Sequence, residues 1–305
     1  MSHILLKSIL AEAHLYNYTT VELLEKILAF KGKTLVFFDT EAAGLEPNVS
    51  YLQMTQLAAM AFDGNTMEPI GEFSEKAKLG HSLSSALNDP TSHGALSIEK
   101  NRQKYLKRYK DKKPPTGLSG YPTDADILNK AGFMHPKDVL AMTKYDSSPA
   151  NMTEGEVLLA FTAFLKRYPN VVLIAHNATF DMKMVQTRLR KNHLPPLQRY
   201  PVLDTIDVSR YFFIPTLQAI ESSDPQAKAY LEQLLSKTKF KSYSSSLGKL
   251  AGVFNIKAGG WHDAMEDIKM LFQLLSKFVE FLEKYKNTDI KRYQVGAVKR
   301  FRHMK

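Results

Sequence analysis

The order of the apolar runs constrains the fold of this chain most. Residues 34–38 form a short buried run, residues 51–62 alternate small and apolar side chains, and residues 70–78 form a weaker third run. Gly64 and Asn65 offer a turn between the last two runs. Short apolar runs separated by turn residues are typical of an antiparallel meander, so we expect the first three strands to pair in that way.

Strands and helices alternate in the second half of the chain. Residues 171–175 and 202–205 are short and apolar enough to be buried strands, and residues 178–191 have helical character between them. Residues 264–286 repeat apolar side chains at the 3.6-residue period of an amphipathic helix. A meander followed by alternating strands and helices predicts an α/β fold with three layers and a mixed, five-stranded sheet.

The same patterns predict how the chain is organised. We expect a helical N-terminal extension over residues 1–32, a main domain over residues 33–286 and a basic tail over residues 287–305. Within the main domain, the periodic pattern dissolves over residues 79–151, where Pro, Gly, Ser and Asn recur. We expect this segment to be an insertion on the core rather than a separate domain.

The chain has no cysteine, which excludes disulfides, thiolate metal sites and cysteine nucleophiles. Any metal must therefore be held by oxygen or imidazole groups. No apolar run approaches the roughly 20 residues of a membrane-spanning helix, and the first residues lack the pattern of a secretory signal. We accordingly expect no membrane partner and a cytoplasmic location.

The net charge of +10 is concentrated in two segments. Residues 99–113 carry eight basic and two acidic side chains, and residues 284–305 carry eight basic and one acidic. Basic charge confined to two places is expected of a protein that binds a polyanion such as nucleic acid. Solvated surface explains either segment equally well when it is taken alone.

Asp39 and Glu41 end the first predicted strand. Side chains two residues apart share one face of a strand, so these carboxylates repel each other unless a cation neutralises them. The pair is therefore a candidate metal site, although a bare Asp-x-Glu at a strand end is more often plain solvated surface.

A second acidic element follows the strand at residues 171–175. Asn177 is placed to cap the next helix, and Asp181 lies in its first turn. An acid at this position also stabilises the helix dipole, and His176 is either structural or a substrate contact. This element alone is a weak indication of function.

The third element opens the last long helix. Asp263 and Glu266 have the spacing of a capping box, which starts the helix at Ala264 and places Asp267 in its first turn. His262 lies just before the helix, after two glycines. The plain alternative is an acid on a polar helix face and an ordinary loop histidine.

Together the three elements resemble the motifs of the DEDDh group of DnaQ-like 3′–5′ exonucleases, which have an RNase H-like fold. Residues 36–45 read V-F-F-D-T-E-A-A-G-L, close to the apolar-D-T-E-T-T-G-L of the group. Residues 176–181 read H-N-A-T-F-D, and residues 262–267 read H-D-A-M-E-D. The resemblance covers about residues 33–78 and 154–282.

This chain departs from the pattern of the group in two places. Ala42 and Ala43 replace the common threonines, which implies altered contacts to the terminal nucleotide. The insertion over residues 79–151 has no counterpart in the compact members of the group.

The resemblance implies a metal-dependent 3′–5′ exonuclease that releases nucleoside 5′-monophosphates with two Mg²⁺ ions, for which Mn²⁺ can substitute. The implied general base is His262, whose imidazole ordinarily titrates near neutral pH. The implied metal ligands are Asp39, Glu41, Asp181 and Asp267.

The resemblance also implies which residues hold the terminal nucleotide. These are Thr40, Ala42, Leu45, Asn177 and Phe180. Phe180 lies at helical spacing with Met184, so it fits the core equally well. Cations of the insertion are expected to follow the nucleic-acid backbone, with stacking on Tyr105 and Tyr109. These cations are Lys104, Lys107, Arg108 and Lys110.

Two alternatives to a DNA exonuclease remain open. We expect the 3′ end of a DNA strand, single-stranded or unpaired, as the substrate, but RNA fits the group as well, because no residue can be identified as the partner of a 2′-hydroxyl. The chain could also be a non-catalytic nucleic-acid-binding or polymerase-associated protein. Against this, all five catalytic positions are intact. The sequence does not identify a polymerase or replication partner.

Overall fold

A computed structural model describes residues 30–43, 53–112, 123–130, 135–142, 145, 152–235, 243–257 and 263–288. Most of the expected N-terminal extension and nearly all of the expected basic tail lie outside these ranges. His262, Leu45 and the two glycines before His262 lie outside them as well.

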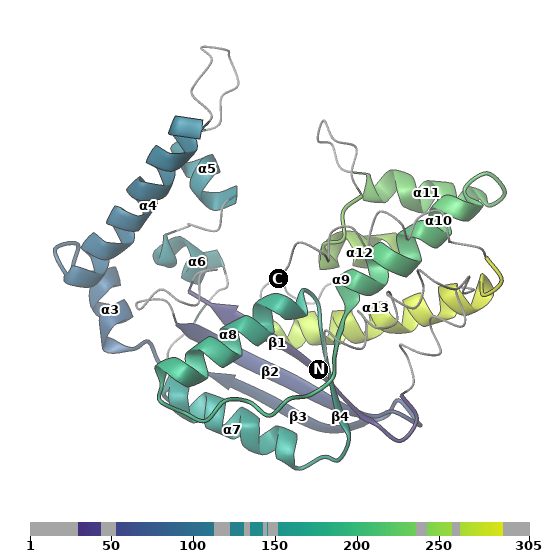
Figure 1. The fold of residues 1–305 in the computed structure, drawn as a ribbon, viewed down its shortest axis with the longest axis horizontal. Coiled ribbons are helices and arrows are strands. Elements are labelled where there is room, and N and C mark those ends of the chain that lie inside the picture. The colour runs from purple at the N-terminus through teal and green to yellow at the C-terminus, as the bar shows by residue number, and fades with distance from the viewer. Residues whose placement is uncertain are drawn as a thin grey trace.

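A five-stranded mixed sheet forms the centre of the molecule (Figure 1). Its strands lie in the order β3-β2-β1-β4-β5. β1 pairs antiparallel with β2, and β2 with β3, whereas β4 pairs parallel with both β1 and β5. The strand bounds are Thr34–Ala42, Met54–Asp63, Pro69–Lys76, Val171–Ala175 and Val202–Asp204 for β1 to β5. The predicted meander and the predicted parallel strands are confirmed, and together they make the expected mixed, five-stranded sheet of an α/β fold.

Helices cover both faces of the sheet. On one face, α13 (Ala264–Lys284) packs against β1 and β2. On the other face lie α7 (Glu154–Lys166) and α8 (Ala178–Lys191). Successive side chains of β1 point to opposite faces of the sheet. Leu35 and Phe37 therefore pack in the core under α13, whereas Val36 and Phe38 pack in the core under α7 and α8. Burial on both faces explains why the first predicted strand is apolar throughout.

A group of short helices follows β5 and leads to α13. They are α9 (Thr205–Val208), a π-helical turn η1 (Ser209–Phe213), α10 (Ile214–Ile220), α11 (Pro225–Leu234) and α12 (Leu247–Val253). α12 contacts both α11 and α13. In Figure 1 it lies between α11 and the N-terminal part of α13.

The insertion over residues 79–151 contains helices that the sequence patterns did not predict. They are α3 (His81–Asn88), α4 (His93–Lys112), α5 (Asp124–Lys130) and α6 (Pro136–Met142). α4 packs its narrow apolar side against α5, where Leu106, Ile127 and Leu128 are buried. Figure 1 shows α3 to α6 on one side of the molecule and α9 to α12 on the other.

Among the residues that the structure describes, no helix is both long enough and apolar enough to cross a membrane.

Candidate active site

Three carboxylates from β1 and α13 lie together. Oxygen atoms of Asp39, Glu41 and Asp267 all lie within 4.8 Å of one another, and all three residues are partly buried. Asp39 and Glu41 have the same parity along β1 as Leu35 and Phe37, so they point to the face that α13 covers. The strand alternation therefore aims this pair at Asp267, which lies in the first turn of α13.

Asp263 fixes the start of α13. Its side chain accepts hydrogen bonds from the backbone N–H groups of Met265 and Glu266, at 3.0 and 3.3 Å. The helix therefore begins at Ala264, as its capping residues predict, and Asp267 is set one turn beyond the cap.

Asp181 reaches the same region from the opposite face of the sheet. It lies in the first turn of α8 and is 2% exposed. Thr40, between the two acids of β1, points to this face and donates two hydrogen bonds to Asp181 Oδ1, from its hydroxyl at 2.7 Å and its backbone N–H at 3.1 Å. Asp181 is therefore not one of the three clustered acids, but its charge raises the pKa of Asp39.

The pKa values of these acids show that their charges are poorly tolerated without a counter-ion. Burial, followed by repulsion from Asp181, Glu41 and Asp267, raises the pKa of Asp39 well above its ordinary value. Burial and then repulsion from Asp267 and Asp181 raise the pKa of Glu41 to about 8. Burial raises the pKa of Asp181 to about 7, although hydrogen bonds from Thr40 lower it. A divalent cation would reverse this balance, because it favours the ionised form of each acid.

Carboxylate oxygens are the ligands preferred by hard cations such as Mg²⁺ and Mn²⁺. Asp39, Glu41 and Asp267 offer three ligand oxygens with the spacing needed for a metal ion. The arrangement therefore fits a divalent-cation site, with Asp181 at its border.

Asp204 has a role at the site that the sequence patterns missed. Asn177 is the N-cap of α8, as expected, but its backbone is left-handed (φ 69°) and its side chain makes no capping hydrogen bond. Instead, Asp204 Oδ1 accepts hydrogen bonds from the N–H groups of Asn177 and Ile206, both at 3.0 Å. Asp204 thereby ties the start of α8, and with it Asp181, to the end of β5.

His176 has a structural role in this arrangement. Its Nδ1 lies 2.9 Å from Thr205 Oγ1. Burial lowers the pKa of His176 to about 4, so the ring is neutral at physiological pH. Of the two roles left open for this residue, the structural one fits these contacts.

The remaining predicted contact residues lie in different environments. Ala42 is 8% exposed and packs in the core under α7 and α8, and Phe180 packs against that core. Thr40 donates its hydroxyl and backbone hydrogens to Asp181, so its hydroxyl oxygen could contact a nucleotide only as an acceptor. His262 and Leu45 are not among the residues that the structure describes.

The cations of the insertion line α4. Lys104, Lys107 and Arg108 are exposed, whereas Lys110 forms an ion pair with Asp124 at 2.8 Å. Tyr105 and Tyr109 pack against the buried side chains between α4 and α5. Both rings are only half-buried, and the expected stacking of nucleotides on them stays a prediction.

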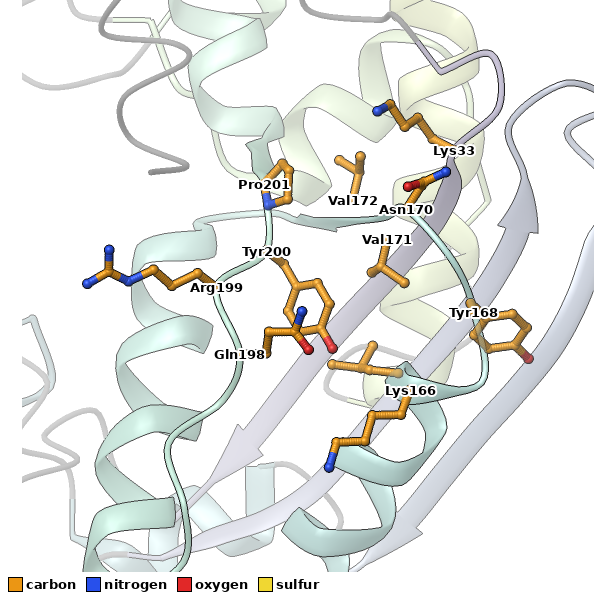
Figure 2. A pocket seen from close by; sticks show the side chains of 11 residues that line it. Lys33, Lys166, Tyr168, Asn170, Val171, Val172, Gln198, Arg199, Tyr200 and Pro201 are labelled. Atoms are coloured by element: carbon orange, nitrogen blue, oxygen red, sulfur yellow. The ribbon is translucent and has the colours of Figure 1, made fainter.

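A hollow of about 410 Å³ lies at the other end of the strands from the acids, where β1 and β4 begin (Figure 2). Its walls include Lys33, Lys166 and Arg199, together with Tyr200, and contain no carboxylate. Parallel strands β1 and β4 separate this hollow from the acids at the end of β1, so it does not belong to the candidate active site.

No family model matches this sequence. Over 144 residues the chain is 27% identical to the PolC-type DNA polymerase III of Streptococcus pneumoniae serotype 2, a match that covers 47% of this chain and 8% of that protein. The chain resembles the DnaQ-like exonucleases. In the mixed sheet, acids at the end of the central strand β1 meet an acid in the first turn of α13, as the acidic residues of the motifs predict, so the resemblance seen in the sequence is confirmed.

Similar solved structures include two nucleases. The complex of E. coli exonuclease I with a dT13 oligonucleotide is 14% identical, with a TM-score of 0.45, and the match covers 87% of this chain and 46% of that one. Cell-death related nuclease 4 is 12% identical, with a TM-score of 0.46, and the match covers 82% of this chain and 64% of that one. The chain thus spans less than half of exonuclease I and a small part of the PolC-type polymerase.

Proposed function

We propose that this chain is a metal-dependent 3′–5′ exonuclease that releases nucleoside 5′-monophosphates from a nucleic-acid strand. The observation that carries the proposal is the meeting of Asp39, Glu41 and Asp267 within 4.8 Å, with Asp181 held beside them by Thr40. Burying several carboxylates that repel one another lowers the stability of the fold, so a purely structural role does not explain them. A site that binds cations does, because the cations neutralise the charges.

Asp39, Glu41 and Asp267 would hold one divalent cation, and Asp39 with Asp181 would border a second. Two such ions supply Lewis acidity, which makes water a better nucleophile and neutralises charge at the scissile phosphate. Mg²⁺ is the expected ion, and Mn²⁺ is expected to substitute.

Side chains of this protein would supply the remaining steps. His262, one residue before the cap of α13, is proposed as the general base that takes a proton from the attacking water. Thr40 is a positioning residue, because it acts on the site through Asp181. Ala42, Leu45, Asn177 and Phe180 are proposed to border the terminal nucleotide.

DNA with a free 3′ end is the proposed substrate. The sequence similarity to a DNA polymerase favours DNA over RNA. The net charge of +10 and the exposed cations of α4 suit a strand that passes over the insertion. We propose residues 33–286 as the catalytic domain, since β1 begins at Thr34 and α13 ends at Lys284.

The decisive experiment follows the shortening of 5′-labelled single-stranded DNA, mismatched duplex DNA and RNA of equal length, and identifies the released mononucleotides by chromatography, with Mg²⁺ or with EDTA. We expect metal-dependent shortening from the 3′ end, fastest on single-stranded DNA. Asp39→Asn should abolish it. Glu221→Gln, at an exposed acid that ends α10, is the matched control and should retain the wild-type rate. Full activity of Asp39→Asn would refute the proposed metal site.

A further inference from the structure

A cavity of about 770 Å³ adjoins the carboxylate cluster. Asp267 forms one wall, Gln233 at the end of α11 forms another, and residues 246–249 with Gly252 of α12 complete it. Its volume lies within the range of roughly 300–1,000 Å³ that is usual for small-molecule sites. Because Asp267 borders both the cavity and the cluster, a ligand in this cavity would touch the candidate active site.

Two of the four α12 residues that line the cavity are glycines, which expose the helix backbone. Gly248 and Gly252 are four residues apart and therefore share one face of the helix. A Cβ atom built at Gly252 meets no atom within 4 Å, so this face looks into open space. Leu250 and Val253, on the other side of α12, are buried in the core. A face of this kind lets a flat group approach the helix closely and selects no particular base.

Two charged side chains line the cavity. Asp267 belongs to the candidate cation site. Lys249 contributes an exposed ammonium group, and none of the ion pairs among the described residues involves it. Gln233 and Ser246 add groups that can hydrogen-bond to a base or a sugar. A chain of phosphates in this space could contact both Lys249 and a cation held by Asp267.

We propose that this cavity is a nucleotide subsite, in which the nucleotide on the 5′ side of the scissile phosphate lies against the glycine face of α12 and Lys249 binds the next phosphate. This inference rests on the proposed exonuclease function. It assigns a strand-binding role to α12 and accounts for its open face.

The first test separates substrates by their number of phosphates. A dinucleoside monophosphate has only the scissile phosphate, whereas a trinucleoside diphosphate also has the one assigned to Lys249. We expect Lys249→Gln to lower the preference for the trinucleotide, as a ratio of kcat/KM values, by roughly tenfold, which is typical of one lost charged hydrogen bond. The change should appear in KM rather than kcat. Lys166→Gln, in the hollow of Figure 2, is the matched control and should keep the wild-type ratio. An unchanged ratio in Lys249→Gln would overturn the assignment.

The second test fills the cavity. Gly252 is helical and has open space at its Cβ, so larger side chains fit there without displacing the core. We expect the KM for the trinucleotide to rise with side-chain size from Gly252→Ala to Gly252→Leu, at a melting temperature no lower than that of the wild type, because Ala and Leu both favour a helix more than Gly does. Equal KM values for the wild type and Gly252→Leu would overturn the subsite.

Binding measurements keep this inference separate from the proposed function. The anisotropy of a fluorescent trinucleotide can be followed with Ca²⁺ in place of Mg²⁺. If the wild type cleaves DNA while Lys249→Gln and Gly252→Leu bind and cleave equally well, the subsite is wrong and the exonuclease stands. If the wild type binds the trinucleotide without cleaving it, the exonuclease fails, and weaker binding by both variants still supports the subsite. If the wild type neither binds nor cleaves, both fail.

Discussion

Thr40 and Asp181, 141 residues apart in the sequence, are joined by two hydrogen bonds to a single carboxylate oxygen. Thr40 belongs to the central strand and Asp181 to the first turn of α8, so these bonds connect the strand that carries Asp39 and Glu41 to a helix on the other face of the sheet.

The first prediction concerns the hydroxyl of Thr40. Hydrogen bonds from Thr40 lower the pKa of Asp181, so their loss should raise it and keep the carboxyl protonated to higher pH. We expect Thr40→Val to shift the acidic limb of the pH–rate profile to higher pH and to slow turnover roughly tenfold on that limb, equivalent to about 1.4 kcal/mol. Thr40→Ser retains the hydroxyl and should restore the wild-type profile. Superimposable profiles for Thr40→Val and wild type would contradict the positioning role.

The second prediction concerns pH and metal removal. The pKa of Glu41 rises to about 8 from an ordinary value of 4.5, so the folded protein binds this proton more tightly than the unfolded chain. The free energy of unfolding of the metal-free protein should therefore be highest at the acidic end of this interval and fall as the pH rises from about 4.5 to 8. Mg²⁺ should stabilise the protein more at about pH 8.5 than at about pH 5.5, because it binds the ionised acids.

Thermal unfolding with EDTA and with Mg²⁺ at several pH values measures this effect. Glu41→Gln cannot ionise, so it should flatten the pH dependence and reduce the Mg²⁺ shift. A metal-free melting temperature that increases across the interval would show that the sign is wrong.

The third prediction concerns a buried ion pair beneath the site. Glu154, in the first turn of α7, accepts hydrogen bonds from Arg188 Nε at 2.7 Å and Nη2 at 2.6 Å, and from the N–H of Met54 at 2.7 Å. Glu154→Ala would leave the guanidinium buried without a carboxylate. We expect a loss of about 3–5 kcal/mol in the free energy of unfolding, measured by urea denaturation.

The matched control for this ion pair is the double variant Glu154→Met with Arg188→Met. It removes both charges and should lose less stability than the single variant. If Glu154→Ala unfolds within about 1 kcal/mol of the wild type, the ion pair does not stabilise the packing of α7 against α8.

The fourth prediction concerns the exposed cations of α4. A triple variant in which Lys104, Lys107 and Arg108 are each changed to Gln should raise the KM for long oligonucleotides. The slope of log KM against log salt concentration should fall by about 0.7 for each phosphate that the variant no longer binds. Lys110→Gln should have a smaller effect, because Asp124 already pairs with Lys110. An unchanged salt slope in the triple variant would place the strand elsewhere.

The parts of the site that local rules control were predictable from the sequence. Strand alternation places Asp39 and Glu41 on one face, and the cap at Asp263 sets the start of α13. The sheet was predictable for the same reason, because the length and spacing of the apolar runs identify the strands. These features depend on residues that are near one another in the chain.

The contacts between distant segments could not be predicted. The bond from Thr40 to Asp181 and the support of α8 by Asp204 depend on the parallel pairing of β4 with β1 and β5, which brings distant segments together. The sequence patterns correctly place Asn177 at the N-cap of α8, but they contain no information about its left-handed backbone, in which its side chain makes no capping hydrogen bond. α4 was missed because Leu106 belongs to a narrow apolar stripe in a strongly charged segment.

The carboxylate site draws on every layer of the molecule. Asp39 and Glu41 come from the sheet, Asp267 from the helix on one face, and Asp181 from a helix on the other. A cation that engages these acids would clamp three layers that otherwise meet mainly through apolar packing. Metal affinity should therefore disappear as soon as either helix detaches, so that cation binding reports the integrity of the whole domain rather than of one loop.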